Sequence, residues 1–224
     1  MTKLFAFYVL VVLTDSPLIA LLALVAVVYF FEGQYRGRYF NPLGPWRRYQ
    51  GRLRLQREVE NNPADALARA ELGRVLVEAG HHEQARVHLE KALAKVGDRA
   101  EPHYHLGLAL LGLGQQEAGF TAIDRALEIR SDLHYGAPHL RRGDFLVARG
   151  KTAEALPHLE RFTRMNASSS EGYYKLGLCQ RSLGNNGAAR LAFEEAGRAY
   201  SQSPGRRRHN RRWWVLAKLA SLRG

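Results

Sequence analysis

The feature that most constrains the fold of this chain is a repeat with a period close to 34 residues. In four places a glycine is followed seven residues later by a second glycine, and successive first glycines are 34, 36 and 34 residues apart. The pairs are Gly73/Gly80, Gly107/Gly114, Gly143/Gly150 and Gly177/Gly184. A fixed period of this length indicates a stack of similar supersecondary units rather than one folded core.

The residues that follow each glycine pair keep the same register. A small residue comes five positions after the second glycine, a large apolar residue four positions later, and a further residue, usually alanine, three positions after that. The large apolar residues are Leu89, Ile123, Leu159 and Phe193. This pattern resembles the tetratricopeptide repeat (TPR), a 34-residue helix–turn–helix unit. The resemblance covers about residues 66–203, in units of about 66–99, 100–135, 136–169 and 170–203.

The resemblance gives each residue size in the pattern a physical reason. The first glycine and the later small residue lie where the two helices of a unit cross closely, and the second glycine ends the first helix in the left-handed conformation. We expect the large apolar residue to fill the interface to the next unit. The third unit departs from the pattern, because it has Arg142 in place of leucine, Phe162 in place of alanine, and two extra residues near Ser131–Tyr135.

The resemblance also implies a partner groove, because in TPR arrays a set of first-helix positions usually lines the concave face. Mapped onto this chain, these positions are apolar and aromatic at the centre and charged at the ends, which favours a peptide with apolar anchors. The alternative is that the last helix of the chain fills the groove. The predicted groove residues are Leu67, Arg74, Val77, Tyr104, Leu108, Leu111, Leu140, Asp144, Val147, Tyr174, Leu178 and Arg181.

The N-terminus reads as a membrane anchor. Of the 28 residues from Leu4 to Phe31, 24 are apolar, and residues 18–31 are apolar without interruption. Two geometries fit: one spanning helix kinked at Pro17, or a hairpin of residues 4–13 and 18–31 in which Asp15 or Ser16 caps the second helix. A cleaved signal peptide is a third interpretation, which the length of the apolar stretch and the arginines that follow it disfavour.

Charge sets the expected orientation of this anchor. Seven arginines follow the apolar segment between residues 36 and 57, whereas only Lys3 and the amino terminus precede it. The positive-inside rule then places the repeats in the cytoplasm, at the inner membrane of a bacterium.

The net charge of +12 is concentrated at the two ends of the chain. Residues 1–61 carry a net +4, residues 62–203 a net +1, and residues 204–224 a net +7 with no acidic residue. Three interpretations of the tail fit: a solenoid cap, an interfacial helix on anionic lipid, or an RNA contact. Because the expected N-terminal anchor already holds the chain at a membrane, lipid is favoured over nucleic acid. The residues predicted to contact an anionic surface are Arg47, Arg48, Arg52, Arg206, Arg207, Arg208, Arg211 and Arg212.

Signals of chemistry are weak in this chain. It has one cysteine, Cys179, and no acid–base pair or catalytic triad stands out, so we expect no enzymatic activity, no cofactor and no bound metal. The fold class expected is all-α, with an N-terminal transmembrane helix or hairpin followed by a TPR α-solenoid of about four repeats and a C-terminal capping helix. The expected segments are a membrane anchor (1–35), a basic juxtamembrane stretch with a half-repeat helix (36–61), four repeats (62–203), and an Arg-rich link with an amphipathic capping helix (204–224).

These features together predict a membrane-tethered adaptor or scaffold. It would bind a protein or peptide partner through the groove and support assembly of a membrane-associated complex, with an integral membrane anchor and contact to anionic lipid. Two alternatives remain open. One is a periplasm-facing envelope assembly factor, and the other is an RNA- or ribosome-associated factor that uses the basic tail.

Overall fold

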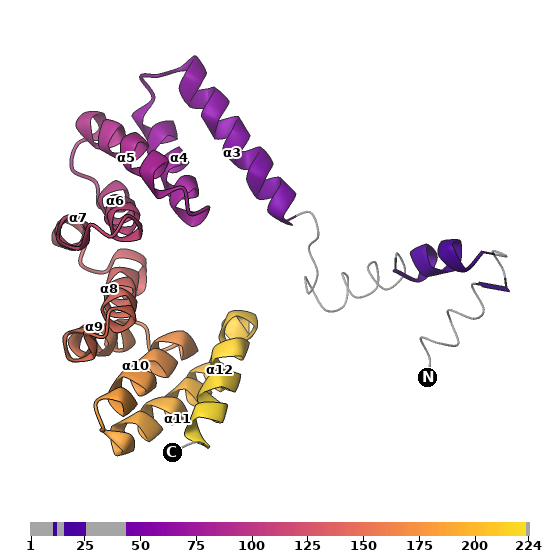
Figure 1. Cartoon of the computed structure of the whole chain (residues 1–224), viewed down its shortest axis with the longest axis vertical. Coiled ribbons are helices and arrows are strands. Elements are labelled where there is room, and N and C mark those ends of the chain that lie inside the picture. The colour runs from indigo at the N-terminus through magenta and orange to yellow at the C-terminus, as the bar shows by residue number, and fades with distance from the viewer. Residues whose placement is uncertain (1–10, 13–15, 26–43, 223–224) are drawn as a thin grey trace. The chain divides into compact units, whose positions relative to one another are not determined.

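The computed structural model describes residues 11–12, 16–25 and 44–222 (Figure 1). The chain divides into two compact units, residues 1–53 and residues 54–224. In the first unit, residues 17–25 are helical, and the N–H of Ile19 donates to Ser16 Oγ at 3.5 Å. Pro17 is therefore the first residue of this helix. Residues 4–10, residues 13–15 and the end of the apolar run at 26–31 lie outside the described residues, so the choice between a kinked span and a hairpin stays a prediction.

Within the described residues, none of the helices reaches both the length and the hydropathy that a membrane span requires.

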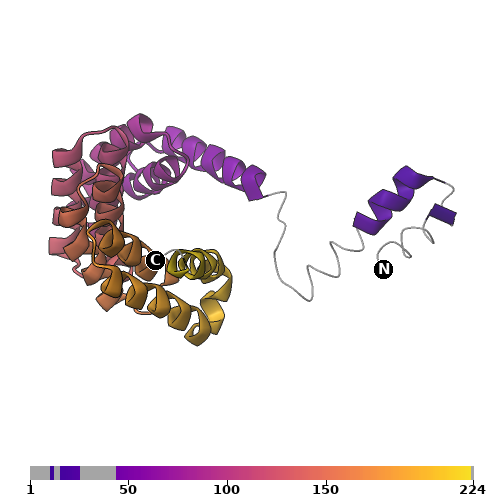
Figure 2. The ribbon, with the colours of Figure 1, turned by 60° about the horizontal axis from the view of Figure 1, so that its bottom comes forward.

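The second unit is built from helices, and its described residues contain no strand. Helix α3 (Gly44–Asn61) begins in the first unit and ends in the second. Four helix pairs follow it and pack one on the next in chain order (Figures 1 and 2). The pairs are α4 (Ala66–Glu78) with α5 (His82–Val96), α6 (Ala100–Gly112) with α7 (Gln116–Ile129), α8 (Ala137–Ala148) with α9 (Thr152–Met165), and α10 (Ser170–Ser182) with α11 (Asn186–Gln202).

The glycine pattern has the geometry that the sequence predicts. The second glycines Gly80, Gly114, Gly150 and Gly184 all have φ between +75° and +80°, in the turn between the two helices of a pair. The first glycines mark the helix crossing. A Cβ on Gly107 would lie 2.6 Å from Ile123 Cγ1 and 2.8 Å from the backbone oxygen of Gly119. No side chain larger than hydrogen fits there without a shift of the helices.

The large apolar residue of each unit has a second role that the sequence analysis did not include. Leu89, Ile123, Leu159 and Phe193 each cover the first glycine of their own pair. They also reach the following unit, as expected: Leu159 belongs to the same core cluster as Cys179 of α10. One side chain therefore closes the crossing within a pair and joins that pair to the next.

The two irregular side chains of the third unit, Phe162 and Arg142, pack against the neighbouring units. The ring of Phe162, which stands where the other units have alanine, occupies the space beside Gly172, where a Cβ would lie 2.4 Å from Phe162 Cε1. Arg142, in place of leucine, turns back to the preceding unit. Its guanidinium carbon lies 4.3 Å from the ring centroid of Phe120, and it forms an ion pair with Asp124.

Both ends of the row are closed by an additional helix. At the start, Val59 of α3 is buried in the core cluster of the first pair, and Leu55 packs against that cluster. At the end, α12 (Arg207–Ser221) packs on α11 and α10. Ala217 and Ala220 are buried in this contact, and the buried Asn210 donates from Nδ2 to the backbone oxygen of Ser168 at 2.8 Å. Helix α12 therefore caps the fourth pair.

The glycine crossing is tested by the substitution Gly107→Ala. Overpacking of this kind costs about 1–3 kcal/mol of unfolding free energy, because the new methyl group meets backbone as well as the Ile123 side chain. Gly187→Ala is the matched control. It lies in α11 with nothing within 4 Å of its Cβ position, and alanine there should be neutral or stabilise the helix by up to about 1 kcal/mol. Thermal unfolding followed by circular dichroism measures the stability of both variants. Equal effects of the two substitutions would contradict the close approach of the helices at Gly107.

A candidate partner-binding face

The first helices of the four pairs, α4, α6, α8 and α10, carry the predicted groove residues, and we call their shared surface the helix-A face. The structure separates these residues into three groups. Tyr104, Leu111 and Leu140 are buried, and Leu67 and Val147 are exposed. The others are half-buried, namely Arg74, Val77, Leu108, Asp144, Tyr174, Leu178 and Arg181. The apolar centre expected for the face is thus largely core of the array, and its accessible part is more polar.

At the first repeat the helix-A face carries an ion-pair cluster of one arginine and two glutamates. Arg74 Nε donates to Glu71 Oε2 at 2.9 Å, and the same guanidinium pairs with Glu78 one turn further along α4. The hydrogen bond from Arg74 lowers the pKa of Glu71, against the opposing effect of burial. Exposed pairs of this kind contribute little to stability, but they orient the side chains.

The joint between the second and third repeats holds an aromatic cluster. The ring of Tyr104, which is 5% exposed, lies 5.2 Å from the ring of His105 and 5.9 Å from that of His134, centroid to centroid. His134 comes from the short helix η1 (Leu133–Gly136), which contains part of the two-residue insertion. Burial raises the pKa of Tyr104, and the nearby Arg141 opposes that shift.

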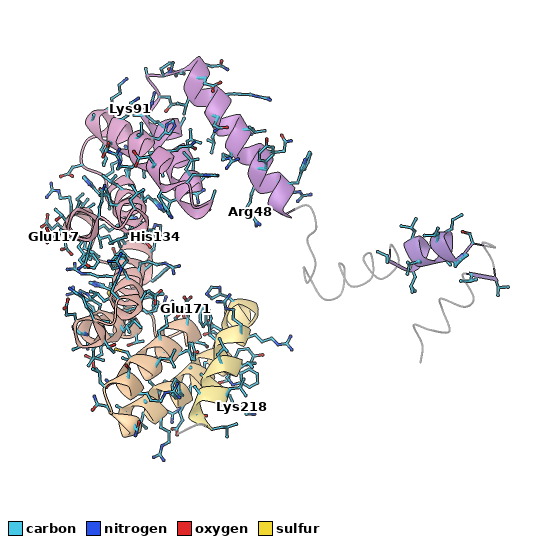
Figure 3. All side chains as sticks on the ribbon, viewed as in Figure 1. Arg48, Lys91, Glu117, His134, Glu171 and Lys218 are labelled. Atoms are coloured by element: carbon cyan, nitrogen blue, oxygen red, sulfur yellow. The ribbon has the colours of Figure 1, made fainter. Side chains whose placement is uncertain are left out.

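The insertion carries local backbone strain. His134 and Tyr135 have φ values of +48° and +55°, which non-glycine residues rarely adopt, and they follow one another. Leu133 is buried in the second core cluster and anchors this turn. Both strained residues are exposed, Tyr135 to 67%. Figure 3 shows His134 and Glu117 on opposite sides of the helix row. The strained turn therefore places the His134 side chain on the helix-A side.

A second polar cluster links the third and fourth repeats to α12. Lys175 Nζ lies 2.8 Å from Glu171 Oε1, pairs with Asp144 of α8, and stands 5.3 Å from the ring centroid of Trp213. Burial raises the pKa of Asp144 despite the lysine. Burial also opposes ionisation of Glu171, but the hydrogen bond and charge of Lys175 hold the pKa of that carboxyl below its usual value. The cluster ties three helices together through one lysine.

Helix α12 covers the predicted groove residues of the fourth repeat. The ring centroid of Tyr174 lies 5.7 Å from that of Trp213, Leu178 packs in the cluster that holds Ala217, and Arg181 donates to the backbone oxygen of Ala220 at 3.3 Å. The self-filling that the sequence left open therefore occurs at the fourth repeat. In the described part of the chain, the principal contacts of α12 are with α10 and α11.

Sequence reasoning missed four residues that the structure adds to the helix-A face: His105, His134, Arg141 and Lys175. These residues do not stand at the positions that line the groove in the TPR family. For His134 a signal existed, because the insertion near Ser131–Tyr135 marked this joint as irregular, but its left-handed backbone was not readable from the sequence. Arg141 is exposed and lies 3.6 Å from Asp144 Oδ2.

The predicted anionic-surface arginines lie on two helices. Arg47 and Arg48 are exposed on α3, where the half-buried Arg52 has its guanidinium carbon 5.4 Å from the ring centroid of Tyr49. Arg211 and Arg212 are exposed on α12. The side chains of Arg206, Arg207 and Arg208 lie outside the described residues.

Histidines and the cysteine form packing contacts. The rings of His139 and His158 stack with centroids 5.9 Å apart, and Cys179 is buried with Sγ 3.4 Å from the backbone oxygen of Thr152. Among the described residues, no group of three or more potential ligand side chains is placed to hold a metal ion.

Comparison with known proteins establishes the family. The sequence matches the tetratricopeptide repeat family over residues 70–134 and 140–204, more than half of the chain. The chain belongs to the TPR family, whose stacked helix pairs present extended surfaces for protein interaction. No curated protein matches its sequence.

Solved structures share the fold at low sequence identity. MamA is 19% identical with a TM-score of 0.60, covering 74% of this chain and 98% of MamA. A TPR protein of Thermus thermophilus, TTC0263, is 20% identical with a TM-score of 0.61, covering 77% and 91%. YrrB, described as a TPR protein with an unusual peptide-binding site, is 19% identical with a TM-score of 0.54, covering 96% and 97%. At this identity the likeness shows the fold alone.

The environment of His105 predicts a pH dependence of stability. Burial and then the charges of Arg74 and His134 lower its pKa to about 4, whereas an unfolded histidine titrates near 6.5. Between these two pH values the unfolded chain binds more protons than the folded chain. The contribution of neutral His105 to the free energy of unfolding is therefore complete above pH 6.5 and is lost as the pH falls toward 4. Lowering the pH from 7.5 to 5 should therefore reduce the free energy of unfolding less in His105→Phe than in the original protein. The expected difference is about 1 kcal/mol, a value discounted for partial exposure.

Melting temperatures at the two pH values measure this effect. His81→Phe, at an exposed histidine, is the control. An unchanged pH dependence in His105→Phe would show that His105 is not held neutral by its surroundings.

Proposed function

We propose that this protein is a membrane-tethered TPR adaptor that holds a protein or peptide partner on the helix-A face at the joint of the second and third repeats. It acts by raising the effective concentration of its partner at the membrane and supports assembly of a membrane-associated complex. No chemistry of its own is required for this role.

The observation that carries the proposal is the strained turn at His134 and Tyr135. Strain of this kind persists only where the surrounding packing over-determines it, and it concentrates at functional sites. Here it holds the exposed ring of His134 5.9 Å from the ring of the buried Tyr104, which also has Arg141 as a neighbour. The next residue, Tyr135, is exposed to 67%. Aromatic rings and arginine are the side chains most enriched at interaction hot spots.

The groups exposed at this joint support a narrower description of the partner than the sequence does. Because Tyr104, Leu111 and Leu140 are buried, they are not free to receive a row of apolar anchors. The accessible groups are His134, Tyr135, Arg141 and Val147. We therefore infer a segment that brings hydrogen-bond acceptors, including a carboxylate for Arg141, together with one apolar contact. The peptide-binding site in the description of YrrB is compatible with this role.

The tether rests on the sequence of the N-terminal segment. Residues 18–31 are uninterrupted apolar residues, and the arginines after them favour a cytoplasmic location for the repeats at a bacterial inner membrane. Among the rival functions, an RNA-associated factor loses support, because both tryptophans of the basic tail pack on tyrosines of the repeats.

Photocrosslinking tests the binding face. A photoreactive amino acid at position 134 of the full chain, in intact cells, should capture one dominant membrane-associated protein, identified by mass spectrometry. The matched control is position 117 on α7, which is exposed on the opposite side of the row. Arg141→Ala should weaken capture at 134 roughly tenfold, the effect of a moderate hot-spot residue. Equal capture at 134 and 117 would contradict the assignment of the face.

A reporter fusion tests the orientation. An enzyme active only outside the cytoplasm, joined after Gly224, should remain inactive while a cytoplasmic reporter at the same position is active. The physical reason is the excess of arginine that follows the apolar segment, which opposes translocation. Activity of the exported reporter would instead support the periplasm-facing alternative.

A further inference from the structure

The cap helix α12 has two faces with different environments. Asn210, Ala217 and Ala220 are spaced seven and three residues apart, share one face, and are buried against the fourth pair. Val215 and Leu219, four residues apart, share the opposite face and are exposed to 40% and 52%, and Leu222, one residue past the end of the helix, is exposed to 76%. Capping the array therefore uses only half of this helix and leaves an apolar strip uncovered among the described residues.

The charge around this strip is of one sign. Residues 204–224 carry seven basic residues and no acidic one. Arg211 and Arg212 precede the strip by one turn and are exposed, and Lys218, labelled on α12 in Figure 3, is exposed beside it. A helix with apolar residues toward one end of a face and cations toward the other matches the boundary between lipid tails and anionic headgroups.

Other occupants fit this face less well. A second copy of the chain would bring the same unbalanced positive charge against the strip, and like charges oppose such contact. Single-stranded RNA would need free ring faces for base stacking. Trp214 instead stacks on Tyr200, with centroids 4.7 Å apart and planes 7° apart, and Trp213 lies between Tyr174 and the guanidinium of Arg212.

We propose that the outer face of α12 docks on an anionic lipid bilayer, with Val215, Leu219 and Leu222 entering the headgroup boundary and Arg211 and Arg212 contacting lipid phosphates. This inference rests on the proposed location of the protein at a membrane, and it is independent of the helix-A face. The two tryptophans fasten the helix to the fourth pair through Tyr174 and Tyr200. Docking would hold the C-terminal end of the repeat array at the membrane surface.

An environment-sensitive dye on α12 tests the docking. The full chain carrying Cys179→Ser and Leu219→Cys is labelled at position 219 and reconstituted into vesicles of phosphatidylcholine alone or with phosphatidylglycerol. We expect a blue shift of the dye emission, and quenching by spin-labelled lipid, in the anionic vesicles. Leu191→Cys is the matched control, because Leu191 is an exposed leucine of α11, and its dye should not respond.

Charge variants then separate the possible outcomes. Replacing Arg211 and Arg212 with glutamine should lower the docked-to-undocked ratio roughly fivefold per arginine, whereas Arg190→Gln on α11 should leave it unchanged. An equal response in neutral and anionic vesicles, or none in either, would overturn the proposal. A dye shift caused by added RNA, or by protein concentration without vesicles, would overturn it in favour of nucleic acid or a second copy. Loss of docking with intact crosslinking at position 134 would refute this inference alone.

Discussion

The rest of the structure depends on the close crossing of the two helices in each pair. At Gly107 the backbones approach until a single methyl group would meet both the oxygen of Gly119 and the side chain of Ile123. That approach lets one large apolar residue per unit cover the crossing and still reach the next pair, as Leu159 does. Because every joint is built this way, side chains on the first helices of successive pairs are brought to one face, where they form contacts that no single pair could make.

The fold was readable from the sequence to the extent that it depends on residue size at fixed spacing. The turn glycines have the positive φ expected of them. Phe162 and Arg142, which depart from the repeat pattern, have packing contacts that the other units lack. The helix-A face was less readable. Family positions identify which residues lie on a face but not how deeply each is buried, and Tyr104, Leu111 and Leu140 are buried because neighbouring units close over them. The left-handed backbone at His134 depends on how Leu133 anchors the insertion, which no local pattern encodes.

Two joints of the array differ in the side chains that cover them. The joint of the third and fourth repeats is filled: Lys175 is shared by Asp144 and Glu171, and Trp213 of α12 stands over it. The joint of the second and third repeats has the exposed ring of His134 and Arg141 beside the buried Tyr104. The first of these joints is closed by these contacts, whereas the second keeps exposed polar groups, and the proposed partner site is placed there. Helix α12 extends this division, since one face closes the array and the other carries the exposed apolar strip.

Amide hydrogen exchange of the full chain, alone and with the protein captured at position 134, tests the central claim most directly. The account predicts slowed exchange in residues 131–148, which contain η1 and α8, because a partner seated on the strained turn suppresses its local opening. It also predicts little change in the part of α7 around Glu117, which lies on the opposite side of the row from His134. Slowed exchange confined to α7 and α9, with residues 131–148 unchanged, would contradict it and move the partner to the other side of the array.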